Sequence, residues 1–316
     1  MRSLLDDRVL FVLHRLEASL AAYDVASGRE RFRVPTGPFP HEMCLSPDRS
    51  RLLVAEYGLH GATAEGEGGN TVGVFDVRRA ERVATIGLGR YRRPHGIAAH
   101  SGGRLFVTCE PQRTLLILRL EDHTVLHAVD VDQDVPHLVA VSPDGRTAFT
   151  ANIGPGTLSA VDVAMGSVLR HVKVLDRPAG MAFSPDGRVL YVAHRDGAAL
   201  ALVDTTRLEL LGRIETGRGP TRVAVTPDGR RAAFPLAYED AVQIADVEAG
   251  TVTHTIPVGR RPAGAAMSAD GRVLFVSCEH ERRVYAVDLA RAEVAGELAT
   301  GEGPDAMACL DLAEVA

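Results

Sequence analysis

The chain has 316 residues, 46% of them hydrophobic, and a net charge of −6 at pH 7. It can bury a large core, and its net negative charge gives it no general attraction to nucleic acid. No apolar stretch approaches the roughly 18 residues of a membrane span, and the N-terminus lacks the features of a signal peptide, so we expect a cytoplasmic protein that binds neither nucleic acid nor a membrane.

The N-terminal stretch, residues 8–34, consists of short apolar segments separated by turn residues: RVLFVLHRLEASLAAYDVASGRERFRV. Segments of this length and spacing predict three consecutive β-strands. These strands correspond to the second, third and fourth strands of the unit that repeats along the rest of the chain.

A proline-led segment recurs from residue 40 onward, as in PHEM, PHGI, PHLV and PAGM. From position 95 the step between the residues that follow these prolines is 42, whereas the step from 41 to 95 is 54. The longer step contains a glycine-rich insertion at about 57–70, YGLHGATAEGEGGN. The seven residues that follow the prolines are His41, His95, His137, Ala179, Thr221, Ala263 and Asp305.

Each unit predicts four strands, as in GMAFS, VLYVAH, AALALVD and LGRIETG, with Asp-Gly turns that are typical of β-hairpins. The last segment, residues 304–315, supplies a first strand with nothing after it. The sequence therefore predicts an all-β fold, with residues 1–316 as a single seven-bladed β-propeller. We expect four antiparallel strands per blade and a last blade closed by N- and C-terminal strands.

The repeat resembles the YVTN-type β-propeller units, which read roughly PxxVAxSPDGxxxYVTNxxxxTVSVID. VPHLVAVSPDGRTAFTANIGPGTLSAVDV is similar to that pattern, and the resemblance spans the chain. Such propellers include binding proteins, lactonases and lyases. The unit PHGI…FVTCE also resembles those of streptogramin (virginiamycin B) lyase, which implies a metal-dependent enzyme.

Three histidines, His41, His95 and His137, begin the inner strands of three consecutive units. In a propeller these strands line the central channel, so the three imidazoles are predicted to converge at one mouth. Such a group is a site for a divalent transition metal: zinc, iron, manganese, nickel or copper. A site that works by acid–base chemistry without metal is the alternative.

A second ring of residues is expected at the same mouth, because the second strand of each hairpin returns beside the first. Glu56 and Glu110 could hold the imidazole N–H groups, bind the metal or act as a general base. Asp305, His14 and His194 could complete the coordination or carry protons. Six members of this ring lie fifteen residues after those of the first, and His14 of the N-terminal strand completes it: Glu56, Glu110, Asn152, His194, Leu236, Cys278 and His14.

Several further residues around the mouth are candidates for binding an anionic or polar substrate. The alternative for the arginines is that they are solvated loop charges, and the insertion at 57–70 could be a lid or a surface loop. The candidates are Arg93, Arg177, Arg261, Arg222, Tyr57 and Asn152.

These patterns favour a monomeric, metal-dependent enzyme that acts on a small polar or anionic substrate. By resemblance its reaction would be of the lyase or hydrolase type. One alternative is a non-haem metal oxidoreductase or oxygenase, since carotenoid-cleaving oxygenases are also seven-bladed and hold iron through histidines. Another alternative is a non-catalytic propeller that binds a ligand or peptide.

Overall fold

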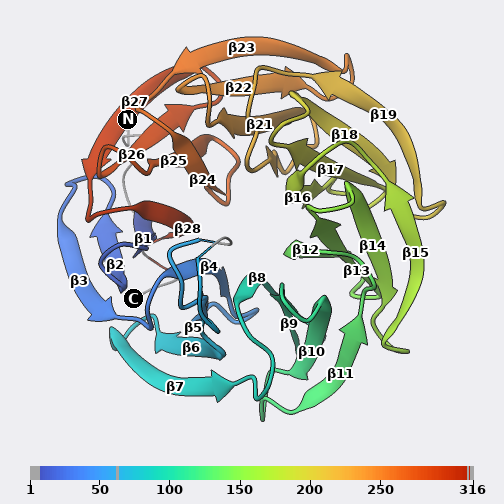
Figure 1. The fold of residues 1–316 in the computed structure, drawn as a ribbon. Coiled ribbons are helices and arrows are strands. Elements are labelled where there is room, and N and C mark those ends of the chain that lie inside the picture. The colour runs from blue at the N-terminus through green and yellow to red at the C-terminus, as the bar shows by residue number, and fades with distance from the viewer. Residues whose placement is uncertain (1–7, 62–63, 312, 314–316) are drawn as a thin grey trace.

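The computed structural model describes residues 8–61, 64–311 and 313. Seven four-stranded antiparallel sheets are arranged in a ring around a central channel (Figure 1). This arrangement is a seven-bladed β-propeller, and the predicted fold class is confirmed. In the described part of the chain there is no helix with the length and hydrophobicity of a membrane span.

Each blade runs from an innermost strand at the channel to an outermost strand at the rim. The first three blades, from inside to outside, are β4 (Pro40–Leu45), β5 (Arg51–Glu56), β6 (Thr71–Asp76), β7 (Glu81–Gly87); β8 (Pro94–His100), β9 (Arg104–Cys109), β10 (Thr114–Arg119), β11 (Val125–Asp130); and β12 (Pro136–Val141), β13 (Thr147–Asn152), β14 (Thr157–Asp162), β15 (Ser167–Lys173). The next three are β16 (Pro178–Phe183), β17 (Val189–His194), β18 (Ala199–Asp204), β19 (Glu209–Glu215); β20 (Ala224–Val225), β21 (Arg231–Leu236), β22 (Ala241–Asp246), β23 (Thr251–Pro257); and β24 (Pro262–Met267), β25 (Val273–Cys278), β26 (Arg283–Asp288), β27 (Glu293–Ala299). The last is β28 (Pro304–Asp311), β1 (Arg8–His14), β2 (Ser19–Asp24), β3 (Glu30–Pro35).

The last blade joins the two ends of the chain. Strand β28 pairs antiparallel with β1, with Phe11 opposite Ala308 and Val12 opposite Met307. This confirms the predicted closure, and it leaves no unpaired sheet edge where the ring would otherwise open.

The core of the propeller lies between neighbouring blades. The middle strands are apolar on both faces, and the seven residues of β1 are all buried. The outermost strands are mostly exposed to solvent instead, as in β7, where only Ile86 is buried. Buried side chains such as Phe106 and Phe234 each stabilise the fold by about 2–3 kcal/mol relative to leaving them exposed.

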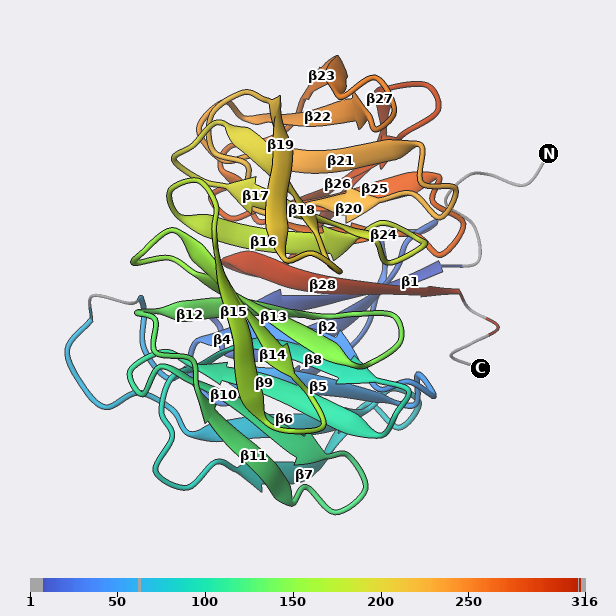
Figure 2. The same ribbon diagram turned by 90° about the vertical axis from the view of Figure 1, so that its right-hand side faces the viewer.

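The inner strands all begin at one mouth of the channel. Strands β28 and β16, for example, both run from the left-hand to the right-hand side in Figure 2, and the loop between β5 and β6 stands on the left. In β4 the pairing shifts after the first residue, because Pro40 is opposite Glu56 and Glu42 is opposite Ala55. His41 is therefore the extra residue of a β-bulge, a feature that re-aims side chains.

Candidate metal centre

Three imidazole rings form a column at the channel mouth, contributed by the neighbouring strands β4, β8 and β12. The rings of His41 and His95 have centroids 4.2 Å apart, and those of His95 and His137 are 3.7 Å apart. The structure thus brings the three predicted histidines together, with His95 in the middle.

The donor atoms form two overlapping sets rather than one set of three histidines. One set is His41, Glu42 and His95, and the other is His95, Glu110 and His137. Within each set the donor atoms lie within 4.8 Å of one another. The two outer rings do not converge on a common point because the ring of His95 lies between them.

Glu110 forms a direct contact with one of the three imidazoles, that of His137. Its Oε1 lies 3.0 Å from Nδ1 of His137, and its Oε2 accepts a hydrogen bond of 2.7 Å from the hydroxyl of Tyr57. Since an ionised carboxylate can only accept, Nδ1 of His137 is the donor in this hydrogen bond. Tyr57 also contacts the column through its ring, with centroids 5.2 Å from His41 and 5.6 Å from His95.

The position of Glu110 depends on a hairpin that is one residue shorter than its counterparts. Pro94 is opposite Cys109, whereas Pro136 in the next blade is opposite Asn152. Glu110 therefore lies one residue beyond the end of β9, as Tyr57 lies one residue beyond β5. A shift of one residue reverses the direction of a side chain, so Glu110 faces the mouth.

The last residues of the second strands do not face the mouth. Glu56, His14, Asn152 and His194 are at most 2% exposed and are held within their blades. Glu56 accepts hydrogen bonds from the backbone N–H of Gly37 and from Thr71, and it pairs with Arg82. These predicted members of the mouth therefore lie outside the donor cluster.

His14, Asn152 and His194 are likewise held by polar contacts. His14 contacts the hydroxyls of Ser19 and Tyr23, and it accepts from the N–H of Gly301. Asn152 bonds the hydroxyls of Thr157 and Ser159. His194 donates through Nδ1 to the carbonyl of Asp176. The second strand runs straight to its end, so strand alternation turns its last side chain into the blade.

Glu42 is a member of the cluster that the sequence did not predict. Its carboxylate pairs with Arg222 from the other side of the channel. Burial raises the pKa of Glu42 to about 7, and Asp305 adds to this rise while Arg222 opposes it. The bulge at His41 is what allows two consecutive side chains to join the same donor set.

Burial keeps the central imidazoles neutral. It lowers the pKa of both His41 and His95 well below 6.5, and the charges of Arg15 and Arg222 lower both further. The Nδ1 atoms of His41 and His95 are buried and have no hydrogen-bond partner among the described residues. Two neutral imidazoles with unpartnered nitrogens are suited to binding a metal.

The predicted Asp305 lies beside the column, with Oδ2 3.6 Å from Nδ1 of His41. Arg15 links it to Glu279, at 3.4 Å from each carboxylate. Glu279 lies one residue beyond β25, in the same place as Tyr57 and Glu110 in their blades. The mouth-facing residues are thus those that follow the second strands.

The predicted arginines have different roles at the rim. Arg222 contacts the donor cluster through Glu42. Arg93 donates to the carbonyls of Ala64 and Gly66, and so holds the inserted loop over the channel. Arg261 and Arg177 pair with acidic residues of their own blades, Glu279 and Asp196.

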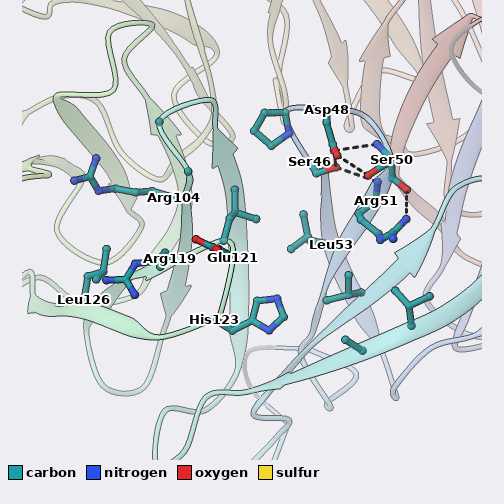
Figure 3. Close-up of a pocket in the computed structure, with 17 residues that line it drawn as sticks. Ser46, Asp48, Ser50, Arg51, Leu53, Arg104, Arg119, Glu121, His123 and Leu126 are labelled. Atoms are coloured by element: carbon teal, nitrogen blue, oxygen red, sulfur yellow. Dashed lines mark hydrogen bonds between the residues drawn. The ribbon is translucent and has the colours of Figure 1, made fainter.

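A separate groove of about 920 Å³ lies between the blades of β4–β7 and β8–β11 (Figure 3). Asp48 and Leu53 line one side of it and His123 the other. Asp48 follows the end of β4, whereas His41 is near its start, so the groove is remote from the histidines. The groove therefore does not contribute to the donor cluster.

The buried His194 gives a test of its role within the blade. Burial lowers its pKa from 6.5 to about 4, so between these pH values the unfolded chain binds a proton that the folded protein does not. Stability therefore falls with falling pH by about 1.4 kcal/mol per pH unit for this group. The His194→Leu variant places at this position the leucine that the next blade has as Leu236, and it lacks the titrating group. From pH 6.5 to 4.5 we expect its free energy of unfolding to decrease by about 2–3 kcal/mol less than that of the wild type.

Urea unfolding at both pH values measures this difference. Leucine replacement of the exposed His254 is the control, and it should keep the wild-type dependence. Equal pH dependence in wild type and His194→Leu would show that the folded protein protonates His194 as readily as the unfolded chain does.

The fold and the cluster define the class of protein: a seven-bladed β-propeller with a histidine–glutamate cluster at one mouth of its channel. No family model matches the chain. Antigen Lp49 of Leptospira interrogans serogroup Icterohaemorrhagiae serovar copenhageni (strain Fiocruz L1-130) is 25% identical over 137 residues, or 43% of this chain. The match spans 29% of that protein's length.

Two solved structures share the architecture. Hydrazine synthase of Kuenenia stuttgartiensis superposes with a TM-score of 0.72 at 20% identity, covering 86% of this chain and 90% of the other. A functionally unknown protein of Desulfotomaculum acetoxidans DSM 771 superposes with a TM-score of 0.79 at 14% identity, covering 95% and 98%. At these identities the likenesses show the fold alone.

Proposed function

We propose that the channel mouth is the metal centre of an enzyme that acts on a small polar or anionic molecule, by lyase or hydrolase chemistry. The observation that carries this proposal is the pair of donor sets, each with two histidines and one glutamate within 4.8 Å. The buried Nδ1 atoms of His41 and His95 support it, because neither has a hydrogen bond among the described residues, whereas buried polar atoms are normally hydrogen-bonded.

The residues that would hold the ion are His41, Glu42, His95, Glu110 and His137. Imidazole and carboxylate donors suit zinc, iron, manganese, nickel or copper. When bound, such an ion polarises a carbonyl or lowers the pKa of water. The side chains of His41, Glu42 and His137 are 15%, 13% and 18% exposed, so the cluster is partly open to solvent.

Glu110 is our candidate for moving a proton. It already accepts from His137 and Tyr57, so it can hold the tautomer of the imidazole and exchange a proton with a substrate at the same place. Burial and the charge of Glu110 raise the pKa of Tyr57, so the phenol remains a donor. Arg222 supplies a positive charge for an anionic group beside Glu42.

The Glu110→Gln variant tests this proposal. Glutamine keeps the shape but loses the charge that orients His137, so we expect metal affinity to fall by about 10–100-fold. Turnover of a panel of lactones and carboxylate esters by the metal-reconstituted protein should fall by about 10²–10⁴-fold. Isothermal titration with cobalt(II) and initial rates measure the two effects.

Glu279→Gln is the matched control, because Glu279 occupies the same place in its blade but pairs with Arg15 and Arg261. It should retain metal affinity and turnover. Turnover that withstands a chelator, or equal losses in the two variants, would contradict the proposed role of the cluster.

A further inference from the structure

His95 is the common member of both donor sets, and this sharing limits how metal can bind. The three rings are tilted stacks, with interplanar angles of 37° and 35° to either side of His95. His41 and Glu42 share one donor set with His95, and Glu110 and His137 share the other. His41 and His137 have no donor set in common, so an ion bound within one set takes a donor from only one of them.

We infer that the cluster contains two metal positions that share His95, one formed with His41 and Glu42 and the other with Glu110 and His137. A neutral imidazole offers a single lone pair, so His95 could serve both positions only as an imidazolate: binding of the second ion would release the remaining N–H proton to solvent, and each ring nitrogen would then bond one ion. Each position then has two nitrogens and one carboxylate from the protein, a donor set that leaves room for water or substrate.

The two positions differ in the interactions of the glutamate carboxylate that a bound ion would disturb. Glu42 is paired with the guanidinium of Arg222, so an ion at its position competes with a fixed positive charge. Glu110 is held by the hydroxyl of Tyr57, which can remain in place around an ion. It is also held by the Nδ1–H of His137, whose proton an ion would replace, the proton moving to Nε2. The position of Glu110 and His137 is therefore the tighter one.

This inference rests on the proposed metal centre and is tested by cobalt(II) titration of the full chain, followed by calorimetry. We expect the wild type to bind two equivalents in two phases. His137→Ala should remove the tight phase and keep one weaker equivalent, whereas His41→Ala should remove the weak phase only. His254→Ala, which changes an exposed histidine of β23, should bind as the wild type does.

Two other results of the titration would distinguish failure of the two-position inference from failure of the proposed metal centre. A single equivalent that both His41→Ala and His137→Ala abolish would overturn the two positions and leave the proposed metal centre standing as one three-histidine site. No cobalt binding by the wild type would overturn both.

A second measurement uses only the wild-type protein and therefore does not depend on the folding of a variant. Anomalous scattering at the cobalt edge from crystals of the wild type should give two peaks, one on each side of His95. A single peak contacting both His41 and His137 would overturn the inference.

Discussion

Replacing His95 by alanine is expected to abolish metal binding, with cobalt(II) affinity reduced more than about 100-fold. His95 belongs to both donor sets, so its loss leaves each with one histidine and one carboxylate. Metal content after reconstitution, measured by mass spectrometry, checks the result.

The control for this variant is His254→Ala, which should keep the metal content of the wild type. Circular dichroism should show that His95→Ala retains the β-fold, because the substitution affects the channel rather than the core between blades. Full metal content in folded His95→Ala would contradict the assignment of His95 as a ligand of both positions.

Replacing Glu56 by alanine is expected to destabilise the fold by about 3 kcal/mol and to leave metal affinity unchanged. Glu56 is buried, and its carboxylate accepts from Gly37 and Thr71 and pairs with Arg82. Removing it leaves these donors without their partner, which costs more than the loss of an exposed ion pair. Urea unfolding and cobalt titration measure the two properties.

Glu56 and Glu110 form a matched pair, because the spacing of the repeat places them at equivalent positions. Glu110→Gln should have the opposite profile, with weakened metal binding and nearly unchanged stability. A loss of metal in a stable Glu56→Ala variant would place Glu56 at the metal centre and contradict its role within the blade.

The fold could be predicted because it depends on a pattern that recurs throughout the chain. Seven prolines, the last six of them 42 residues apart and each before a short apolar strand, predict seven blades and their closure. The same regularity predicts that His41, His95 and His137 meet, since equivalent positions in neighbouring blades lie side by side in β4, β8 and β12 (Figure 1).

The rest of the site depends on local irregularities of strand pairing that spacing does not reveal. The hairpin of β8 and β9 is one residue shorter, which turns Glu110 toward the mouth although Glu56 faces into its blade. The bulge at His41 brings Glu42 into the cluster. The sequence did contain one usable signal, the alternation of side-chain direction along the second strand. If the last residue of that strand faces into the blade, the residue after it faces the mouth.

The most direct test of the metal centre is the metal content of the wild-type protein, purified without a histidine tag and measured by mass spectrometry. We predict at least one equivalent of a transition metal, bound as purified or after reconstitution. The element found would also separate hydrolytic from redox chemistry, since zinc has no redox activity and iron or copper does. No metal after reconstitution with zinc, iron, copper, nickel and manganese would contradict the proposed metal centre.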